Sequence, residues 1–207
     1  MRLICISDTH GQHELLTIPT GDVLVHAGDL TAHSTSYELS DFFSWMAAQK
    51  FPARIVIGGN HDRLFETHPE LARSLVPECI TYLQDTGCQV GGLHFWGSPV
   101  TPRFFDWAFN RDRGGAIAKH WNMIPEETDV LISHGPARGI LDKDAYGVEA
   151  GCADLRHRIE ALQLKAHICG HMHSSYGQSK LGHTVMVNAA ICDEAYRPLR
   201  TPIVVDL

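Results

Sequence analysis

The chain has 207 residues, of which 44% are hydrophobic and 20% are charged. This composition is typical of one globular domain with a sizeable core, and we expect a single domain over residues 1–207. No apolar run approaches the roughly 18 residues that span a membrane, so no membrane partner is expected. The formal net charge is −7 without a basic stretch, which argues against stable binding to nucleic acid.

The N-terminal apolar run is short and becomes polar at Ser7 and Asp8. It is therefore too short for a signal peptide and indicates a first strand. The six cysteines are scattered, and no Cys-x-x-Cys pair occurs. Free thiols in a chain without a signal peptide predict a cytoplasmic protein.

Short aliphatic runs that do not alternate predict strands buried on both faces of a sheet. In chain order these runs are 3–7, 23–27, 54–57, 130–133 and 166–169, and a last strand is expected at 202–207. Two hairpins are predicted at 88–98 and 176–187, with turns at Gly91-Gly92 and Leu181-Gly182.

Helices are predicted between these strands. Residues 36–50 place Leu39, Phe42, Phe43 and Met46 on one face, residues 152–162 repeat the pattern, and residues 113–122 are a weaker candidate. Together, the predicted strands and helices indicate an α/β (α+β) fold, a four-layer sandwich of two mixed β-sheets flanked by helices. The stretch 98–113 is predicted to be an irregular loop, and its four aromatic residues argue against disorder.

Five short stretches place a candidate metal ligand directly after an apolar run. They are Asp8-Thr9-His10, Gly28-Asp29, Gly59-Asn60-His61-Asp62, Ser133-His134-Gly135 and Gly170-His171-Met172-His173. Each alone is commonly a turn or a helix cap, but ligands gather beyond the carboxyl ends of strands in open α/β sheets. The five together predict a metal site at the strand C-terminal ends.

The donor types narrow the choice of metal. Oxygen and nitrogen donors without Cys suit Mn, Fe, Zn, Mg, Co or Ni, of which we favour Mn, and they disfavour a structural zinc site. Asn188 and Asp193 are weaker candidates, expected to support the ligands only indirectly, and so is His26. Of the other histidines, His167 is expected to be structural, and the rest are expected at the surface: His13, His33, His68, His94, His120, His157 and His183.

These motifs, in this order, resemble the calcineurin-like metallophosphoesterases over nearly the whole chain. Further stretches are similar to the metallophosphoesterase-domain-containing phosphodiesterase group, among them His26-Ala27-Gly28-Asp29-Leu30-Thr31 and Gly97-Ser98-Pro99-Val100-Thr101-Pro102. The resemblance implies two divalent cations and hydrolysis of phosphodiesters, including cyclic nucleotides. It implies a first metal held by Asp8, His10, Asp29 and His173, and a second held by Asp29, Asn60, His134 and His171.

Two such cations would lower the pKa of a bridging water and give a hydroxide nucleophile near neutral pH. His61, next to the ligand Asn60, is then the candidate general acid for the leaving group, and Asp62 is expected to orient it.

A nearby cation would offset the negative charge of a phosphate. Four arginines lie in stretches near the ligands: Arg103, Arg111, Arg113 and Arg138. Of these, Arg103 and Arg138 are our candidates for substrate binding. Trp107 and Phe109, with Phe104 and Phe105, form either a stacking wall for a nucleobase or a loop packed by its own aromatics.

The leading hypothesis is thus a dinuclear-metal-dependent phosphodiesterase acting on a small phosphodiester or a nucleotide. Two alternatives stay open: a phosphomonoesterase or protein phosphatase, and a non-catalytic scaffold that binds metal and nucleotide. The sequence does not specify the oligomeric state.

Overall fold

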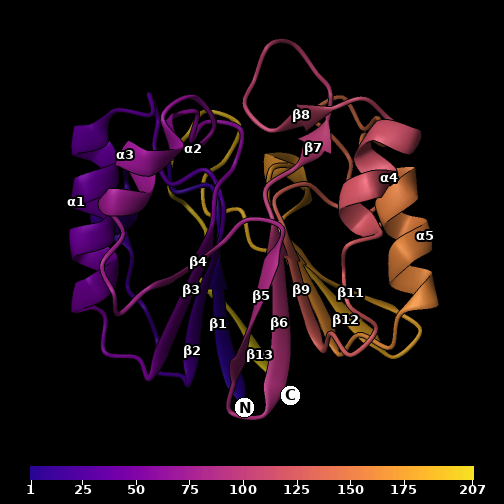
Figure 1. Ribbon diagram of the computed structural model, residues 1–207, viewed down its shortest axis with the longest axis horizontal. Coiled ribbons are helices and arrows are strands. Elements are labelled where there is room, and N and C mark those ends of the chain that lie inside the picture. Colours follow the sequence, from indigo (N-terminus) through magenta and orange to yellow (C-terminus); the bar gives the residue numbers. More distant parts are fainter.

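The computed structural model describes residues 1–207 and consists of two mixed β-sheets packed face to face, with helices on both outer sides (Figure 1). This is the four-layer sandwich predicted from the sequence. The first sheet has the strand order β13-β1-β2-β3-β4. Its strands are β1 (Arg2–Ile6), β2 (Val23–Ala27), β3 (Ala53–Ile57), β4 (Thr81–Leu83) and β13 (Ile203–Asp206).

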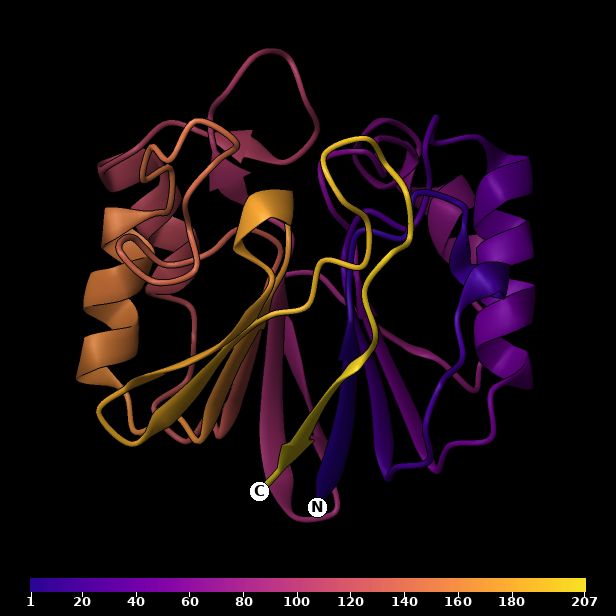
Figure 2. The same ribbon diagram turned by 180° about the vertical axis from the view of Figure 1, so that it is seen from behind.

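The second sheet has the order β11-β12-β10-β9-β6-β5. Its strands are β5 (Thr86–Val90), β6 (Leu93–Ser98), β9 (Val130–Ser133), β10 (Ala166–Cys169), β11 (Gly177–Leu181) and β12 (Thr184–Asn188). After β12 the chain crosses over to the first sheet and forms β13 there (Figure 2). Only β13, β5 and β11 run antiparallel to their neighbours.

Helices α1 (Ser36–Ala48), α2 (Leu64–Thr67) and α3 (Pro69–Ser74) lie on the side of the first sheet, and α4 (Gly115–Trp121) and α5 (Ala153–Ala161) on the side of the second (Figure 1). Helix α1 begins with a capping box, in which Thr35 and Glu38 each accept the other's backbone N–H. Two short 3-10 helices are η1 (His13–Leu15) and η2 (His173–Ser175). None of the helices combines the length and the apolar character needed to cross a lipid bilayer.

Alternation along β1 explains why its sequence is apolar throughout. Leu3 and Cys5 pack into the core between the two sheets, whereas Ile4 and Ile6 pack toward the helix α1 layer. A third core lies between the second sheet and α4 and α5. Strands buried on both faces therefore account for the continuous apolar runs, as predicted.

The five predicted ligand-bearing strands and the three predicted helices are present, with ends that differ by a few residues. The first hairpin turns at Gly91-Gly92 as predicted, but the second turns one residue later than predicted, at Gly182-His183. Helices α2 and α3 and strand β4 were not predicted. The stretch 98–113 is not wholly irregular, because β7 (Thr101–Pro102) and β8 (Asn110–Arg111) pair and close its base.

The parallel strands direct their carboxyl ends to one edge of the molecule, the upper edge in Figure 1, while both chain ends lie at the opposite edge. The loop between β7 and β8 projects from the same upper edge. The fold therefore brings the five motif-bearing loops and this long loop together.

Candidate metal centre

All seven predicted ligands gather at this edge. Asp8 and His10 follow β1, Asp29 follows β2 and Asn60 follows β3, while His134 follows β9 and His171 and His173 follow β10. Six of the seven ligand residues are buried, and His171 is half-buried. The first sheet thus supplies four ligands and the second sheet three.

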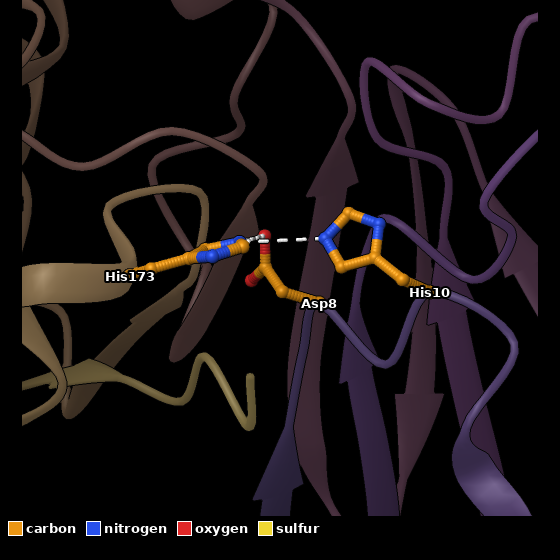
Figure 3. A group of neighbouring side chains, drawn as sticks. All are labelled: Asp8, His10 and His173. Carbon is orange, nitrogen blue, oxygen red and sulfur yellow. Dashed lines mark hydrogen bonds and ion pairs between the residues drawn. The ribbon is translucent and has the colours of Figure 1, made fainter. Parts of the chain in front are cut away.

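One cluster joins Asp8, His10 and His173, whose potential ligand atoms all lie within 4.8 Å of one another (Figure 3). The Nε2 atoms of His10 and His173 are 3.3 Å apart. Nε2 of His173 also lies 3.4 Å from Oδ1 of Asp8. Three metal-binding groups from distant parts of the chain therefore face one another.

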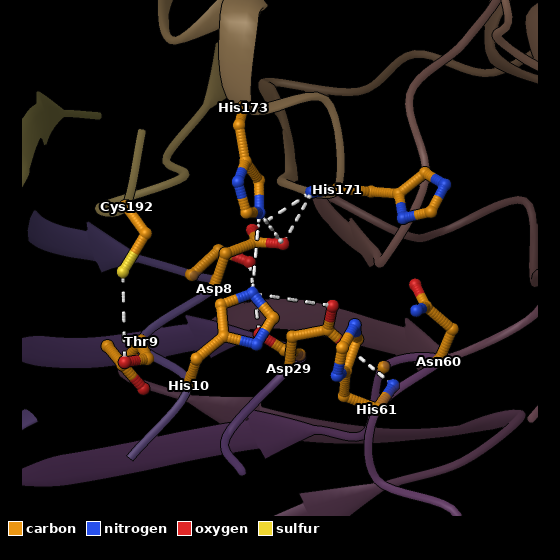
Figure 4. A network of polar contacts seen from close by, with 12 residues as sticks. Asp8, Thr9, His10, Asp29, Asn60, His61, His171, His173 and Cys192 are labelled. Atoms are coloured by element: carbon orange, nitrogen blue, oxygen red, sulfur yellow. Dashed lines mark hydrogen bonds and ion pairs between the residues drawn. The ribbon is translucent and has the colours of Figure 1, made fainter. Parts of the chain in front are cut away.

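A second cluster joins Asp29, His134 and His171, again with ligand atoms within 4.8 Å. Nε2 of His134 lies 3.4 Å from Oδ2 of Asp29 and 2.9 Å from Oδ1 of Asn60. The same Oδ2 of Asp29 is 3.8 Å from Nε2 of His10 in the first cluster. Asp29 therefore lies between the two clusters, where a carboxylate can bridge two cations (Figure 4).

Hydrogen bonds to the far side of two imidazoles show that this donor set fits metal ions. Nδ1 of His134 donates to the carbonyl of Ala27 at 2.9 Å, and Nδ1 of His173 donates to the carbonyl of Asp193 at 3.0 Å. Since a carbonyl can only accept, Nδ1 carries a proton, so Nε2 of each ring points into its cluster and offers its lone pair there when a metal replaces any proton on it. This is the arrangement that orients histidines as metal ligands.

The backbone is strained at the ligands. Asp8, His10, Asp29 and His171 have φ values of 53°, 45°, 56° and 67°, in the left-handed region that non-glycine residues rarely adopt. Such conformations cost on the order of 1–3 kcal/mol each and cluster at functional sites. Gly170 permits a close approach here, because a Cβ at this position would overlap the Asp8 carboxylate.

The charges of the site compensate one another when no metal is present. Burial opposes the charge of His134, but the adjacent Asp29 carboxylate outweighs it and raises the pKa of His134 to about 9. Burial likewise opposes the charge of His173, yet the contact with Asp8 raises its pKa to about 8. For His171, by contrast, burial lowers the pKa to about 3. The two carboxylates are thus balanced by two imidazolium ions, whose place cations can take.

His61 lies beside the ligands, and one of its ring nitrogens is within 4.8 Å of ligand atoms of His10 and Asp29. Its Nδ1 lies 3.1 Å from the carbonyl of Ala32, so Nδ1 carries a proton and Nε2 is left to act on a bound molecule. The ring stacks on Trp107, with centroids 4.4 Å apart and an interplanar angle of 28°. Two contacts therefore fix the orientation of His61.

Asp62 does not contact the His61 ring, contrary to the expectation that it orients this ring directly. Its buried carboxylate accepts the backbone N–H groups of Leu30, Thr31 and Gly59 and the Thr31 hydroxyl at 2.9 Å. Burial, with the nearby Asp29, raises the pKa of Asp62 to about 7. Asp62 therefore ties the loop after β2 to the loop after β3, and so holds Asp29 and Asn60 in register.

The weaker candidates support the ligands indirectly. Asn188 donates to the carbonyl of Met172 at 2.9 Å, and Asp193 holds His173 through its carbonyl. Nε2 of His26 lies 3.0 Å from the hydroxyl of Thr9, the residue between Asp8 and His10. His13, which was expected at the surface, is buried instead, because its ring packs on Phe42 and Trp45.

The predicted substrate residues separate into two groups. Arg103 lines a cavity beside His171, and Trp107 lines the cavity over the ligands. Phe109 is only 1% exposed and belongs to the core beneath α1, so its assignment to a substrate wall is wrong. The exposed Arg138 lies 4.0 Å from Glu149 and lines neither cavity.

Two side chains that border the ligands belong to no sequence motif and are missed by the sequence analysis. Tyr196 packs edge-on against His10, with centroids 4.7 Å apart, and Glu194 lies at the rim. Arg113, which was only one of four possible arginines, lines the cavity beside His171. Tyr196 and Glu194 lie in the segment between β12 and β13, and only the path of that segment brings them to the ligands (Figure 2).

Comparison with known proteins agrees with this geometry. The sequence profile described as calcineurin-like phosphoesterase matches residues 1–175. The chain belongs to this family. It is 37% identical to human metallophosphoesterase domain-containing protein 1 over 231 aligned residues, which cover 100% of this chain and 71% of the human protein.

Solved structures share the fold at low sequence identity. TT1561 of Thermus thermophilus has a TM-score of 0.66 at 15% identity, covering 90% of this chain and 88% of its own. Phosphopantetheinyl hydrolase from Mycobacterium tuberculosis has a TM-score of 0.67 at 12% identity, with coverages of 97% and 95%. Membership of the family implies metal-dependent hydrolysis of phosphoesters, and the two ligand clusters provide the candidate metal sites.

Proposed function

We propose that this protein is a dinuclear-metal-dependent phosphodiesterase in which His61 is the general acid. The observation that carries the proposal is the lining of the cavity over the ligands, which has a volume of about 180 Å³. The lining contains aromatic, imidazole and acidic side chains but no Arg or Lys. A phosphomonoester is a dianion, so a site for it needs cationic side chains in addition to the metals. A diester carries one negative charge, which the metals alone can offset.

When bound, two divalent cations polarise the phosphate oxygens and activate a water near neutral pH. Asp8, His10, Asp29 and His173 would hold one cation, and Asp29, Asn60, His134 and His171 the other. The donor set admits several metals, and Mn is our first choice.

His61 lies beside the ligands without belonging to the proposed ligand set, and its ring can carry a transferable proton. Its Nδ1 is engaged by Ala32, so Nε2 is the atom that donates a proton to the leaving oxygen. Trp107 on one face and the Ala32 carbonyl at one edge keep the ring from turning. Preorganisation of this kind contributes to general acid catalysis because no reorientation is needed during the reaction.

The test is turnover of bis-p-nitrophenyl phosphate, p-nitrophenyl phosphate and cyclic nucleotides by the Mn-loaded protein. We expect diesters to be hydrolysed faster than the monoester. Faster turnover of the monoester would favour a phosphomonoesterase or protein phosphatase. Two bound Mn ions without turnover of any phosphoester would favour a non-catalytic scaffold.

Other features support the proposed compartment, domain organisation and substrate class. All six cysteines are free thiols, which suits a reducing compartment such as the cytoplasm. The two sheets share one central core, which supports a single domain over residues 1–207. The net charge of −7 supports a small phosphodiester or nucleotide, rather than a nucleic acid, as the substrate.

A further inference from the structure

Three cavities meet at the metal centre. The central cavity borders Asp29 and Asn60. A second cavity of about 340 Å³ shares His171 and His173 with it and is called the His171 cavity. A third of about 620 Å³ shares His61 and Trp107 with it and is called the His61 cavity. The two flanking cavities have no lining residue in common, so they open to different sides of the ligands.

A phosphodiester has two substituents, and the position of the proton donor distinguishes the sides. In the proposed hydrolysis the oxygen of water forms a new bond to phosphorus, and the bond from phosphorus to the leaving oxygen breaks with its electron pair. The leaving oxygen takes a proton from His61, and a proton of the water returns to His61 through solvent. A leaving group that needs this proton must therefore lie next to His61, and a leaving group that needs none departs along the same in-line path.

Resting on the proposed function, we infer that the leaving group occupies the His61 cavity and that the substituent kept on the product phosphate occupies the His171 cavity. The orientation of the diester is thus fixed by the flanking cavities. The His171 cavity is within the size range of small-molecule sites, so the retained substituent is about as large as a ring system rather than a methyl group.

The charges of the His171 cavity indicate that this substituent is uncharged. Arg113 donates to the carbonyls of Gly151 and Ala150 at 2.8 and 2.7 Å, and Arg103 pairs with Asp112 at 2.6 Å. Both guanidinium groups thus have partners already. The carboxylates of Asp144 and Glu194 also line the cavity and balance the two arginines. A second phosphate would find no net positive charge here.

Substrates that share one leaving group test this orientation. Bis-p-nitrophenyl, methyl p-nitrophenyl and p-nitrophenyl phosphate all release p-nitrophenolate, but they retain an aryl group, a methyl group and no substituent. Ala150→Trp fills the His171 cavity, and Ala145→Trp does so from its exposed rim. Each should lower kcat/KM for the bis-aryl diester by about tenfold or more and leave the other two within about twofold.

A substitution in the His61 cavity provides the contrasting test, because this cavity is assigned to the leaving group. His33 is an exposed residue that lines the His61 cavity, and His33→Trp should lower kcat/KM for all three substrates equally, since their leaving group is the same. Ala161→Trp, on an exposed position of α5, controls for added bulk and should change none of them. Equal losses on all three substrates with both Ala150→Trp and Ala145→Trp, or no loss with either, would overturn the orientation.

A binding measurement separates this inference from the proposed activity. Phenylphosphonate and methylphosphonate mimic the two product types and are not hydrolysed. In calorimetric titrations of the Mn-loaded protein, phenylphosphonate should bind about tenfold more tightly, and Ala150→Trp should remove that preference. If the wild-type protein showed no preference, the assignment of the His171 cavity would be wrong even for an active diesterase. A preference without any turnover would contradict the proposed function alone.

Discussion

Nε2 of His10 and Nε2 of His173 face each other at 3.3 Å, although 163 positions separate the two residues in the chain. Nδ1 of His173 is committed to a backbone carbonyl, and Nδ1 of His10 is buried without any partner. Without a metal, a proton on Nε2 of His173 can be shared with Nε2 of His10, and a cation that replaces this proton would satisfy both lone pairs. The pair therefore has the form of a metal site.

Asp29 lies between the two clusters, so its loss should weaken both sites. Asp29→Asn keeps the shape of the side chain but removes its charge, and we expect binding of Mn at both sites to weaken by at least about tenfold. His171→Ala should affect one site only. Calorimetry with elemental analysis gives the number of bound ions, and His157→Ala, on the exposed face of α5, is the control. Retention of two tight sites by Asp29→Asn would contradict the bridging role.

Gly170→Ala should disturb the first metal site without removing any ligand. The added Cβ would overlap the Asp8 carboxylate and the Ser7 hydroxyl, so Asp8 must move and Mn affinity should fall. Gly115→Ala is the matched control, because a Cβ there has no atom within 4 Å. If both variants bound Mn as tightly as the wild type does, the close packing of Asp8 on Gly170 would not be needed for metal binding.

His61→Ala should leave metal content intact and slow the hydrolysis of diesters with poor leaving groups by about 10²–10⁴-fold, the usual contribution of a general acid. The effect on p-nitrophenyl diesters should be much smaller, since p-nitrophenolate departs without a proton. Undiminished rates on alkyl or nucleotide diesters would exclude the acid role.

Trp107→Ala should reproduce part of the His61→Ala effect, because the indole stacks on the His61 ring. Trp107→Phe, which keeps an aromatic face, should restore most of the rate. Comparing a nucleotide diester with bis-p-nitrophenyl phosphate tests whether the indole also stacks on a nucleobase. A change in the ratio of the two rates after Trp107→Ala would show that it does.

His167 should make the protein less stable in acid. Burial lowers the pKa of His167 to about 3 in the folded protein, whereas an unfolded histidine titrates near about 6.5. Between these values the unfolded chain binds a proton that the folded protein does not, so stability falls as the pH falls, by up to about 1.4 kcal/mol per pH unit.

His167→Gln removes this group and should give a smaller loss of stability between pH 6.5 and 4.5. Urea unfolding with chelator at several pH values measures the difference, and the chelator excludes any contribution from bound metal. Parallel curves for the wild type and the variant would show that His167 is protonated in the folded state.

The ligand set could be predicted from sequence because it depends on a local rule. Each ligand follows a buried parallel strand, and parallel strands end at a common edge, so Asp8, Asn60 and His134 converge without knowledge of the strand order. The fold class followed for the same reason, from apolar runs such as residues 130–133.

Contacts between loops could not be predicted, because they depend on how the loops fold back. Phe109 follows other aromatic residues in the sequence, yet the pairing of β7 with β8 directs its side chain toward the core. Asp62 follows His61 directly, but its carboxylate turns toward the loop after β2. Tyr196 reaches His10 from the far end of the chain. No periodicity or motif encodes these relationships.

The pairing of β1 with β13, in which Arg2 lies opposite Asp206, bears on how the protein is made. On the ribosome, the strand that leads into Asp8 and His10 has an open edge until residues near 206 have emerged. Pairings between such distant residues form slowly, and an open strand edge invites aggregation. Closure of this edge of the first sheet therefore depends on β13, and removal of residues 203–207 should favour aggregation over assembly of the metal centre.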